Sequence, residues 1–147
     1  MDGDSLDGYA IKCISALLPS LPSKHRYRVL FMSRPVKEIV RSQEQMKRRR
    51  GTAESGEPAA TIIAALTKHH EDILNFMQIR PRAFDFMVVD YPSLVADPEP
   101  WVARIAAFLG PAVLPHPGRM GDVIRPALHR IRSASLQPEP MRQGDAF

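Results

Sequence analysis

The sequence contains little that would support redox, metal-thiolate or membrane functions. Cys13 is the only cysteine among 147 residues, which excludes a disulfide within one chain and a zinc or iron–sulfur site built from several cysteines. No apolar run approaches the roughly 18 to 20 residues that span a bilayer. The early acidic residues Asp2, Asp4 and Asp7 differ from the basic region of a signal peptide. We therefore expect a soluble, cytoplasmic protein without a membrane span.

The composition is that of a folded protein. Apolar residues make up 44% of the chain and charged residues 24%, which is close to the globular average and excludes wholesale disorder. A chain of this length suits one compact domain rather than two. We predict an α/β domain over residues 1–132 and a polar, weakly ordered tail over residues 133–147.

Positive charge is concentrated in one segment. Ten lysine or arginine residues lie between positions 24 and 50 against Glu38 and Glu44, a local charge of +8. Residues 51–115 carry four basic and eight acidic residues, a local charge of −4. This distribution indicates an anionic partner, which could be a phosphate, a nucleotide, a nucleic acid or an acidic surface.

Hydrophobic periodicity predicts strands that alternate with helices. Short segments rich in aromatic and β-branched residues predict three strands, and apolar positions three and four residues apart predict four helices. Gly51 and Gly110 are placed to end two of the helices, and Asp97 with Pro98 to begin one. Continuous apolar character in the last strand predicts burial on both faces. The expected strands are 9–14, 27–32 and 84–89, and the expected helices are 35–50, 59–79, 98–109 and 122–132.

This element order favours a layered α/β fold with a mainly parallel sheet. In such sheets ligands bind beyond the carboxyl ends of the strands, where helix N-termini offer free N–H groups to anions. Arg34 follows the second predicted strand and can fork onto a phosphate. Ser42 lies eight residues later, a little over two helical turns, and so returns to the same side of the helix. The alternative is that Arg34 pairs with a carboxylate and Ser42 faces solvent.

The segment 27–51, YRVLFMSRPVKEIVRSQEQMKRRRG, resembles the 3′-phosphate-binding segment of the sulfotransferase family. That pattern is an apolar strand, an Arg, an acidic residue four positions on and a Ser eight positions on, here Arg34, Glu38 and Ser42. Pro35 stands where the family usually has Asp or Asn. The segments 86–110 and 9–18 are similar to further family elements, so the resemblance covers roughly residues 9–132.

The resemblance implies a three-layer, P-loop-NTPase-like sulfotransferase fold that is incomplete at its N-terminus. It implies sulfuryl transfer from PAPS (3′-phosphoadenosine 5′-phosphosulfate) to a hydroxyl or amine. Arg34 and Ser42 would hold the 3′-phosphate of PAPS or of adenosine 3′,5′-bisphosphate. The resemblance assigns no catalytic base, and no metal is expected.

The family's loop for the 5′-phosphosulfate has no counterpart in this sequence. Residues 1–8 contain no such element, and no Gly-x-x-x-x-Gly-Lys run occurs anywhere. Three interpretations stay open: a truncated gene, a degenerate family member, or a chain completed by a partner. Because the absent strand is central in the family fold, we expect exposed sheet edges and association with a second copy or another chain.

Two other groups of residues have both a structural and a functional interpretation. His69 and His70 beside acidic residues suggest a base or a metal site, yet an ordinary helix surface explains them. The run Lys47–Arg50 suggests an anionic partner, although cations in a last helical turn also oppose the helix dipole. Few aromatic residues lie near this run, which disfavours nucleic acid. The alternative function is therefore a non-catalytic interaction module that binds an anionic partner through this basic helix.

Overall fold

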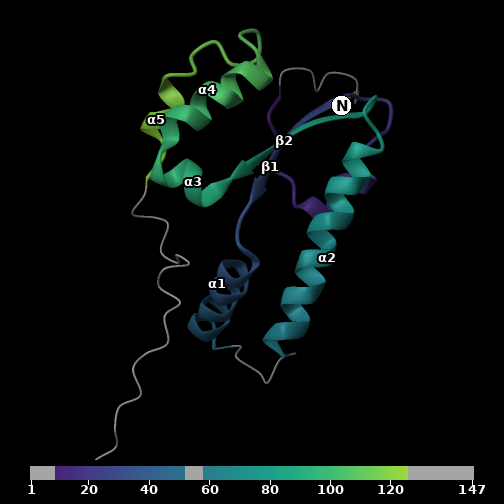
Figure 1. Ribbon diagram of the computed structural model, residues 1–147, viewed down its shortest axis with the longest axis vertical. Helices are drawn as coiled ribbons and strands as arrows, with labels where there is room; N and C mark the ends of the chain where they lie inside the picture. Colours follow the sequence, from purple (N-terminus) through teal and green to yellow (C-terminus); the bar gives the residue numbers. More distant parts are fainter. Residues whose placement is uncertain (1–8, 52–57, 126–147) are drawn as a thin grey trace, which may run out of the picture.

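A computed structural model describes residues 9–51 and 58–125 (Figure 1). The first described element is a short 3₁₀ helix, η1 (Ser15–Ser20). Strand β1 (Tyr27–Ser33) leads into helix α1 (Val36–Arg49), and the long helix α2 (Ala59–Gln78) leads into strand β2 (Phe84–Asp90). Helices α3 (Tyr91–Ala96), α4 (Pro98–Leu109) and α5 (Arg119–Asp122) follow. The coarse expectation of an α/β protein is confirmed.

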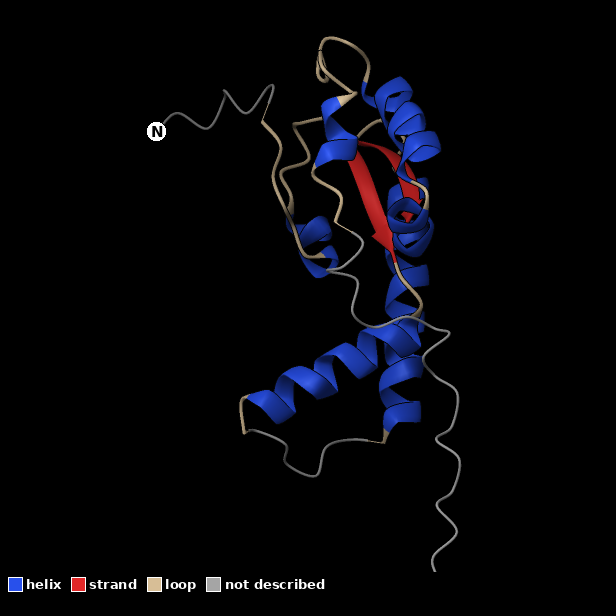
Figure 2. Cartoon of the chain, turned by 90° about the vertical axis from the view of Figure 1, so that its left-hand side faces the viewer, coloured by secondary structure: helices blue, strands red, loops and turns tan. Residues whose placement is uncertain are grey.

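The two strands pair in parallel. Their register runs from Tyr27 opposite Phe84 to Ser33 opposite Asp90, and they form the complete sheet among the described residues. A parallel pair needs a crossover connection, which α1 and α2 supply. Both views show α1 and the first half of α2 extending past the carboxyl ends of the strands (Figures 1 and 2).

Alternation along the strands gives the sheet two packed faces. On one face, Tyr27, Val29 and Phe31 of β1 join Phe84 of β2 in a cluster with η1 and α2, whose centre is the fully buried Met77. On the other face, the Arg28 guanidinium donates a hydrogen bond to the carbonyl of the last α4 residue. The sheet is therefore a layer between helices, as the α/β order predicts.

Local signals place most helix ends where the sequence predicts them. Gly51, just past α1, has φ +68°, and Gly110, at the end of α4, has φ +78°. These are left-handed conformations that glycine adopts at little steric cost. Asp97 occupies the N-cap position of α4, although its side chain makes no capping hydrogen bond there.

The predicted strand over residues 9–14 is wrong. These residues belong to neither strand of the sheet, and the side chains of Tyr9, Ile11 and Ile14 are exposed. Strand-forming residues give a strand only where a neighbouring strand accepts their backbone hydrogen bonds. No described strand does so for this segment.

The prediction that β2 is buried on both faces holds only in part. Val89 is fully buried, whereas the adjacent Val88 is 37% exposed and Met32 on β1 is 49% exposed. With two strands in the sheet, side chains near its edges lack neighbours on one side. The predicted helix 122–132 lies largely outside the described residues, which contain α5 at 119–122 instead, and the predicted tail 133–147 lies wholly outside them.

Candidate functional site

The carboxyl ends of the two strands bring the candidate site together. Because β1 and β2 are parallel and Ser33 lies opposite Asp90, the residues that follow each strand leave the sheet at the same edge. These residues are Arg34, before α1, and Tyr91, the first residue of α3. This is the edge at which open α/β sheets bind ligands.

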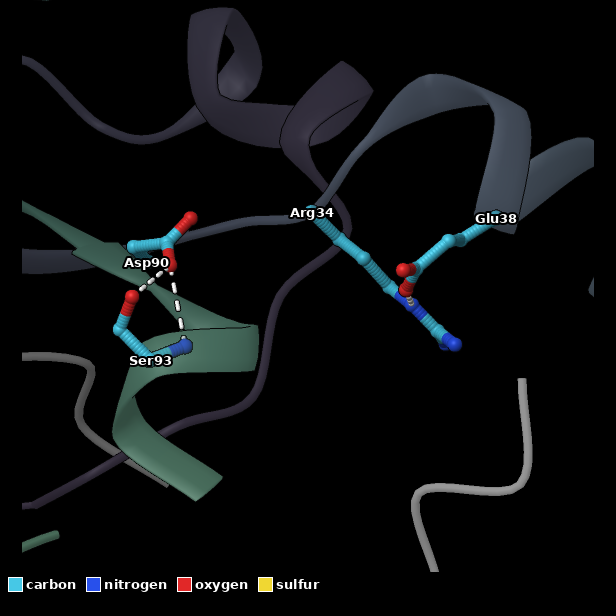
Figure 3. Close-up of polar contacts among 4 residues, drawn as sticks. All are labelled: Arg34, Glu38, Asp90 and Ser93. Atoms are coloured by element: carbon cyan, nitrogen blue, oxygen red, sulfur yellow. Dashed lines mark hydrogen bonds and ion pairs between the residues drawn. The ribbon is translucent and has the colours of Figure 1, made fainter. Parts of the chain in front are cut away.

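Arg34 is held in place by two side chains. Its Nε donates to Oε2 of Glu38 over 2.9 Å, and its Cζ lies 5.6 Å from the centroid of the Tyr91 ring. The Glu38 side chain is 2% exposed and that of Arg34 is 24% exposed, so the pair runs from the interior to the surface. In Figure 3 the Arg34 side chain points away from Asp90 and toward Glu38. The guanidinium is therefore oriented before any ligand arrives.

The contact of Arg34 with Glu38 bears on the bland alternative for Arg34, whereas phosphate binding by Arg34 stays a prediction. Arg34 pairs with a carboxylate, as the bland alternative requires, yet the carboxylate is the acidic residue four positions on in the sulfotransferase-like pattern. The guanidinium of an Arg side chain carries five N–H donors and can contact more than one acceptor at a time. Orientation by one carboxylate and contact with a second anion are compatible.

The start of α1 adds backbone donors to this edge. The Pro35 carbonyl accepts hydrogen bonds from the amides of Glu38 and Ile39, over 2.9 Å and 3.2 Å. The amides of Val36 and Lys37 precede these bonds and have no intrahelical acceptor. Because the helix dipole places partial positive charge at the same end, the first turn of α1 favours an anion near Arg34.

Ser42 is one helical turn beyond Glu38 on the same side of α1. It is half-buried, and no described contact joins its hydroxyl to Arg34. Glu38 and Ser42, four residues apart within α1, lie along one face of the helix, and Arg34 precedes its first turn. Ser42 is therefore one helical turn from the residue whose carboxylate pairs with Arg34.

Asp90 has a structural role at the same edge. Its Oδ2 accepts a hydrogen bond from the Ser93 backbone amide over 3.0 Å and another from the Ser93 hydroxyl (Figure 3). This is an N-cap of α3, with Pro92 in the first turn. The cap fixes the turn that carries Tyr91 to Arg34.

His69 and His70 take part in packing rather than forming a site together. The Ser15 hydroxyl lies 2.9 Å from Nε2 of His69, which links η1 to α2. The His70 ring meets Phe31 of β1 edge to face, with centroids 5.0 Å apart. Within residues 9–51 and 58–125, no group of three His, Cys, Asp or Glu side chains is arranged to bind a metal ion.

No helix in the described part of the chain has both the length and the apolar character of a bilayer span. Comparisons with protein-family models, with curated proteins and with solved structures find no match. The function is therefore inferred from the site itself.

Proposed function

We propose that this chain is a sulfotransferase-like nucleotide-binding protein that holds the 3′-phosphate of PAPS or of adenosine 3′,5′-bisphosphate with Arg34 and Ser42. The observation that carries the proposal is the orientation of the Arg34 guanidinium at the carboxyl edge of a parallel strand pair. A bound phosphate there would meet a charged fork, the first amides of α1 and a hydroxyl. Each of these groups is a donor suited to an oxyanion.

Glu38 contributes to the proposed site without contacting the ligand. Its buried carboxylate accepts a hydrogen bond from Nε of Arg34, whose side chain is 24% exposed. The centroid of the Tyr91 ring lies 5.6 Å from Cζ of Arg34, so the ring restricts the movement of the guanidinium on that side. The Arg34 side chain therefore loses little further conformational freedom when a phosphate binds, which favours affinity.

Sulfuryl transfer requires a second half of the site. In that reaction the acceptor oxygen or nitrogen forms a bond to sulfur, the bond from sulfur to the bridging phosphate oxygen breaks, and the acceptor proton passes to a base. The leaving phosphate needs donors where its charge develops, and no described residue forms a loop of that kind. We propose that these donors come from another segment or a partner chain, within a P-loop-NTPase-like sheet of which β1 and β2 form a part.

Calorimetric titration with adenosine 3′,5′-bisphosphate tests the proposal. We expect binding by the wild-type chain, its loss in Arg34→Ala and a weakening of about tenfold in Ser42→Ala, which removes one hydrogen bond to a charged group. Arg48→Ala is the matched control, because it removes an exposed cation from the far end of α1. Adenosine 5′-phosphate serves as the ligand control, since it lacks the 3′-phosphate.

Two results would refute this assignment. One is the absence of binding by a wild-type chain whose circular dichroism shows it to be folded. The other is equal affinity for the two nucleotides, which would mean that the 3′-phosphate is not recognised. Equal losses in Arg34→Ala and Arg48→Ala would assign any binding to general positive charge.

A further inference from the structure

The far end of α1 carries a basic surface that the nucleotide site does not use. We call the side chains of Met46, Arg48, Arg49 and Arg50 the distal basic surface. All four residues are exposed, and they lie in the part of the chain that extends beyond the sheet (Figures 1 and 2). Arg34 lies just before the opposite, N-terminal end of this helix.

The positive charge of this surface is not balanced by the described residues around it. Glu38 is buried and paired with Arg34, so Glu44 is the remaining acidic residue of α1. The facing half of α2, residues 59–66, contains no charged side chain. Among residues 9–51 and 58–125, Arg48, Arg49 and Arg50 form no ion pair. A favourable interaction with the helix dipole explains a cation in this turn, but it does not require three adjacent arginines.

The arrangement of the side chains narrows the kind of partner. Consecutive helical residues point about 100° apart, and Arg50 still has helical backbone angles, so the three arginines spread around the helix end. By the same geometry Met46, 46% exposed, lies between Arg49 and Arg50. A nucleic-acid duplex is stiff and presents its phosphates along fixed lines, so it is bound best by cations that lie in a row. Here the cations surround the end of a helix and an adaptable apolar side chain lies among them. This arrangement suits a flexible acidic polypeptide that also carries apolar side chains.

Nucleic acid fits the surface less well for a second reason. Single strands are bound by stacking their bases on aromatic side chains, and α1 contains no aromatic residue. Arginine pairs with carboxylates and with phosphates alike through two parallel hydrogen bonds, so the guanidinium groups accept either anion and the side chains around them decide between the partners. A glutamate-rich polypeptide can supply both the carboxylates and an apolar side chain for Met46.

We propose that the distal basic surface docks an acidic, partly apolar polypeptide segment of a partner protein. Binding is electrostatic, with Met46 as the apolar contact, and is independent of nucleotide at Arg34. The surface then connects the nucleotide-binding chain to a second protein from the outer end of the α1–α2 pair. This function goes beyond the proposed nucleotide site and does not depend on it.

Fluorescence anisotropy on the full chain tests the proposal, with a labelled peptide of repeating Glu-Glu-Glu-Leu units as the probe. We expect Arg48→Gln/Arg49→Gln/Arg50→Gln to weaken binding by about tenfold or more, since several exposed pairs of modest strength are lost. The matched control, Lys12→Gln/Arg26→Gln/Arg82→Gln, removes the same charge from exposed positions elsewhere. It should retain most of the affinity.

Met46→Ser tests the apolar contact. We expect it to weaken binding of the Glu-Glu-Glu-Leu peptide but not of an all-Glu peptide. Raising the ionic strength from about 0.01 M to about 0.15 M should weaken both peptides, because screening shortens the reach of exposed charges. Arg34→Ala should leave peptide binding unchanged, which separates this proposal from the nucleotide site.

Three outcomes would overturn the proposal. Equal weakening by the two triple variants would show that net charge alone attracts the peptide. Tighter binding of a short DNA duplex than of the peptide, lost in the distal triple variant, would assign the surface to nucleic acid. No binding by a wild-type chain that circular dichroism shows to be folded would remove the surface as a docking site for acidic chains.

Discussion

Replacing Arg34 with Ala tests how the candidate site is held together, apart from any ligand. The change removes the Nε donor that lies 2.9 Å from Oε2 of Glu38. The Glu38 side chain is 2% exposed, so its carboxylate keeps a buried negative charge that the positive charge of Arg34 no longer offsets. Breaking a fully buried pair costs roughly 3–5 kcal/mol, and an exposed pair contributes less than about 1 kcal/mol. Because the Arg34 end of this pair is 24% exposed, we expect a loss of about 2 kcal/mol in the free energy of unfolding.

A double-mutant cycle separates the pair from its surroundings. Glu38→Gln keeps the shape and an acceptor but removes the buried charge, so we expect a loss of about 1 kcal/mol. In that background Arg34→Ala should cost about 1 kcal/mol less than in the wild type, because no buried charge is left behind. Urea denaturation followed by circular dichroism measures all four proteins, and each kcal/mol should lower Tm by about 2–4 °C.

The reasoning fails if the two changes are additive to within about 0.3–0.5 kcal/mol, because Glu38 would then not sense the charge of Arg34. A loss of about 2 kcal/mol leaves a chain of ordinary stability folded, so Arg34→Ala remains usable in the nucleotide titration. Arg34→Lys adds a further comparison. Lys keeps the charge but lacks the planar fork, so we expect it to restore part of the stability and little of the nucleotide affinity.

Four further predictions concern packing, capping, titration and assembly. Met77→Ala, at a fully buried position, should lower the free energy of unfolding by about 2–5 kcal/mol in urea denaturation. Met46→Ala, at a side chain that is 46% exposed, should lower it by less than about 0.5 kcal/mol. Similar losses in the two variants would contradict the burial of Met77. Asp90→Ala should cost about 1 kcal/mol, and an unchanged midpoint would mean that the α3 cap contributes nothing. The hydrogen bond to Asp72, together with its charge, raises the pKa of Lys68 above 10.5. The stability that this exposed pair contributes is therefore present below pH 10.5 and is lost as the pH rises through the raised pKa of Lys68. An NMR titration in which Asp72→Asn did not lower the pKa of Lys68 would exclude Asp72 as the cause of the shift. Light scattering at micromolar concentration should show a dimer or larger species, since both outer edges of the described sheet are open, and a monomer would count against association.

Most helices could be predicted because their signals are local. The expected helices 35–50, 59–79 and 98–109 correspond to α1 (Val36–Arg49), α2 (Ala59–Gln78) and α4 (Pro98–Leu109). An apolar stripe at helical period, ended by a glycine or begun near a proline, lies wholly within the segment that it describes. No distant residue is needed to interpret it.

Strands depend on partners, and this is where the sequence prediction fails. Residues 9–14 have the same strand-forming character as β1, but pairing decides which segment becomes a strand, and β1 pairs with β2 instead. Helix α3 was missed for a different reason. Asp90 before Pro92 and Ser93 is an N-cap pattern that marks the start of α3. The helix is only six residues long, between β2 and α4, and so it is too short to show a helical hydrophobic period.

The candidate site combines one feature that the sequence predicts with one that it does not. The four-residue spacings from Arg34 to Glu38 and from Glu38 to Ser42 can be read from the chain, and they allow side chains near one helix face to meet. The contact of Arg34 with Tyr91 requires that Ser33 lie opposite Asp90, a pairing of residues 57 positions apart in sequence. An antiparallel pairing would carry Tyr91 to the far edge of the sheet, and a slip of one residue would turn the core face of β2 to its other side. The buried Phe84 and the partly buried Tyr27 face each other across this register with their rings stacked 5.4 Å apart. Their packing therefore also affects the surroundings of Arg34.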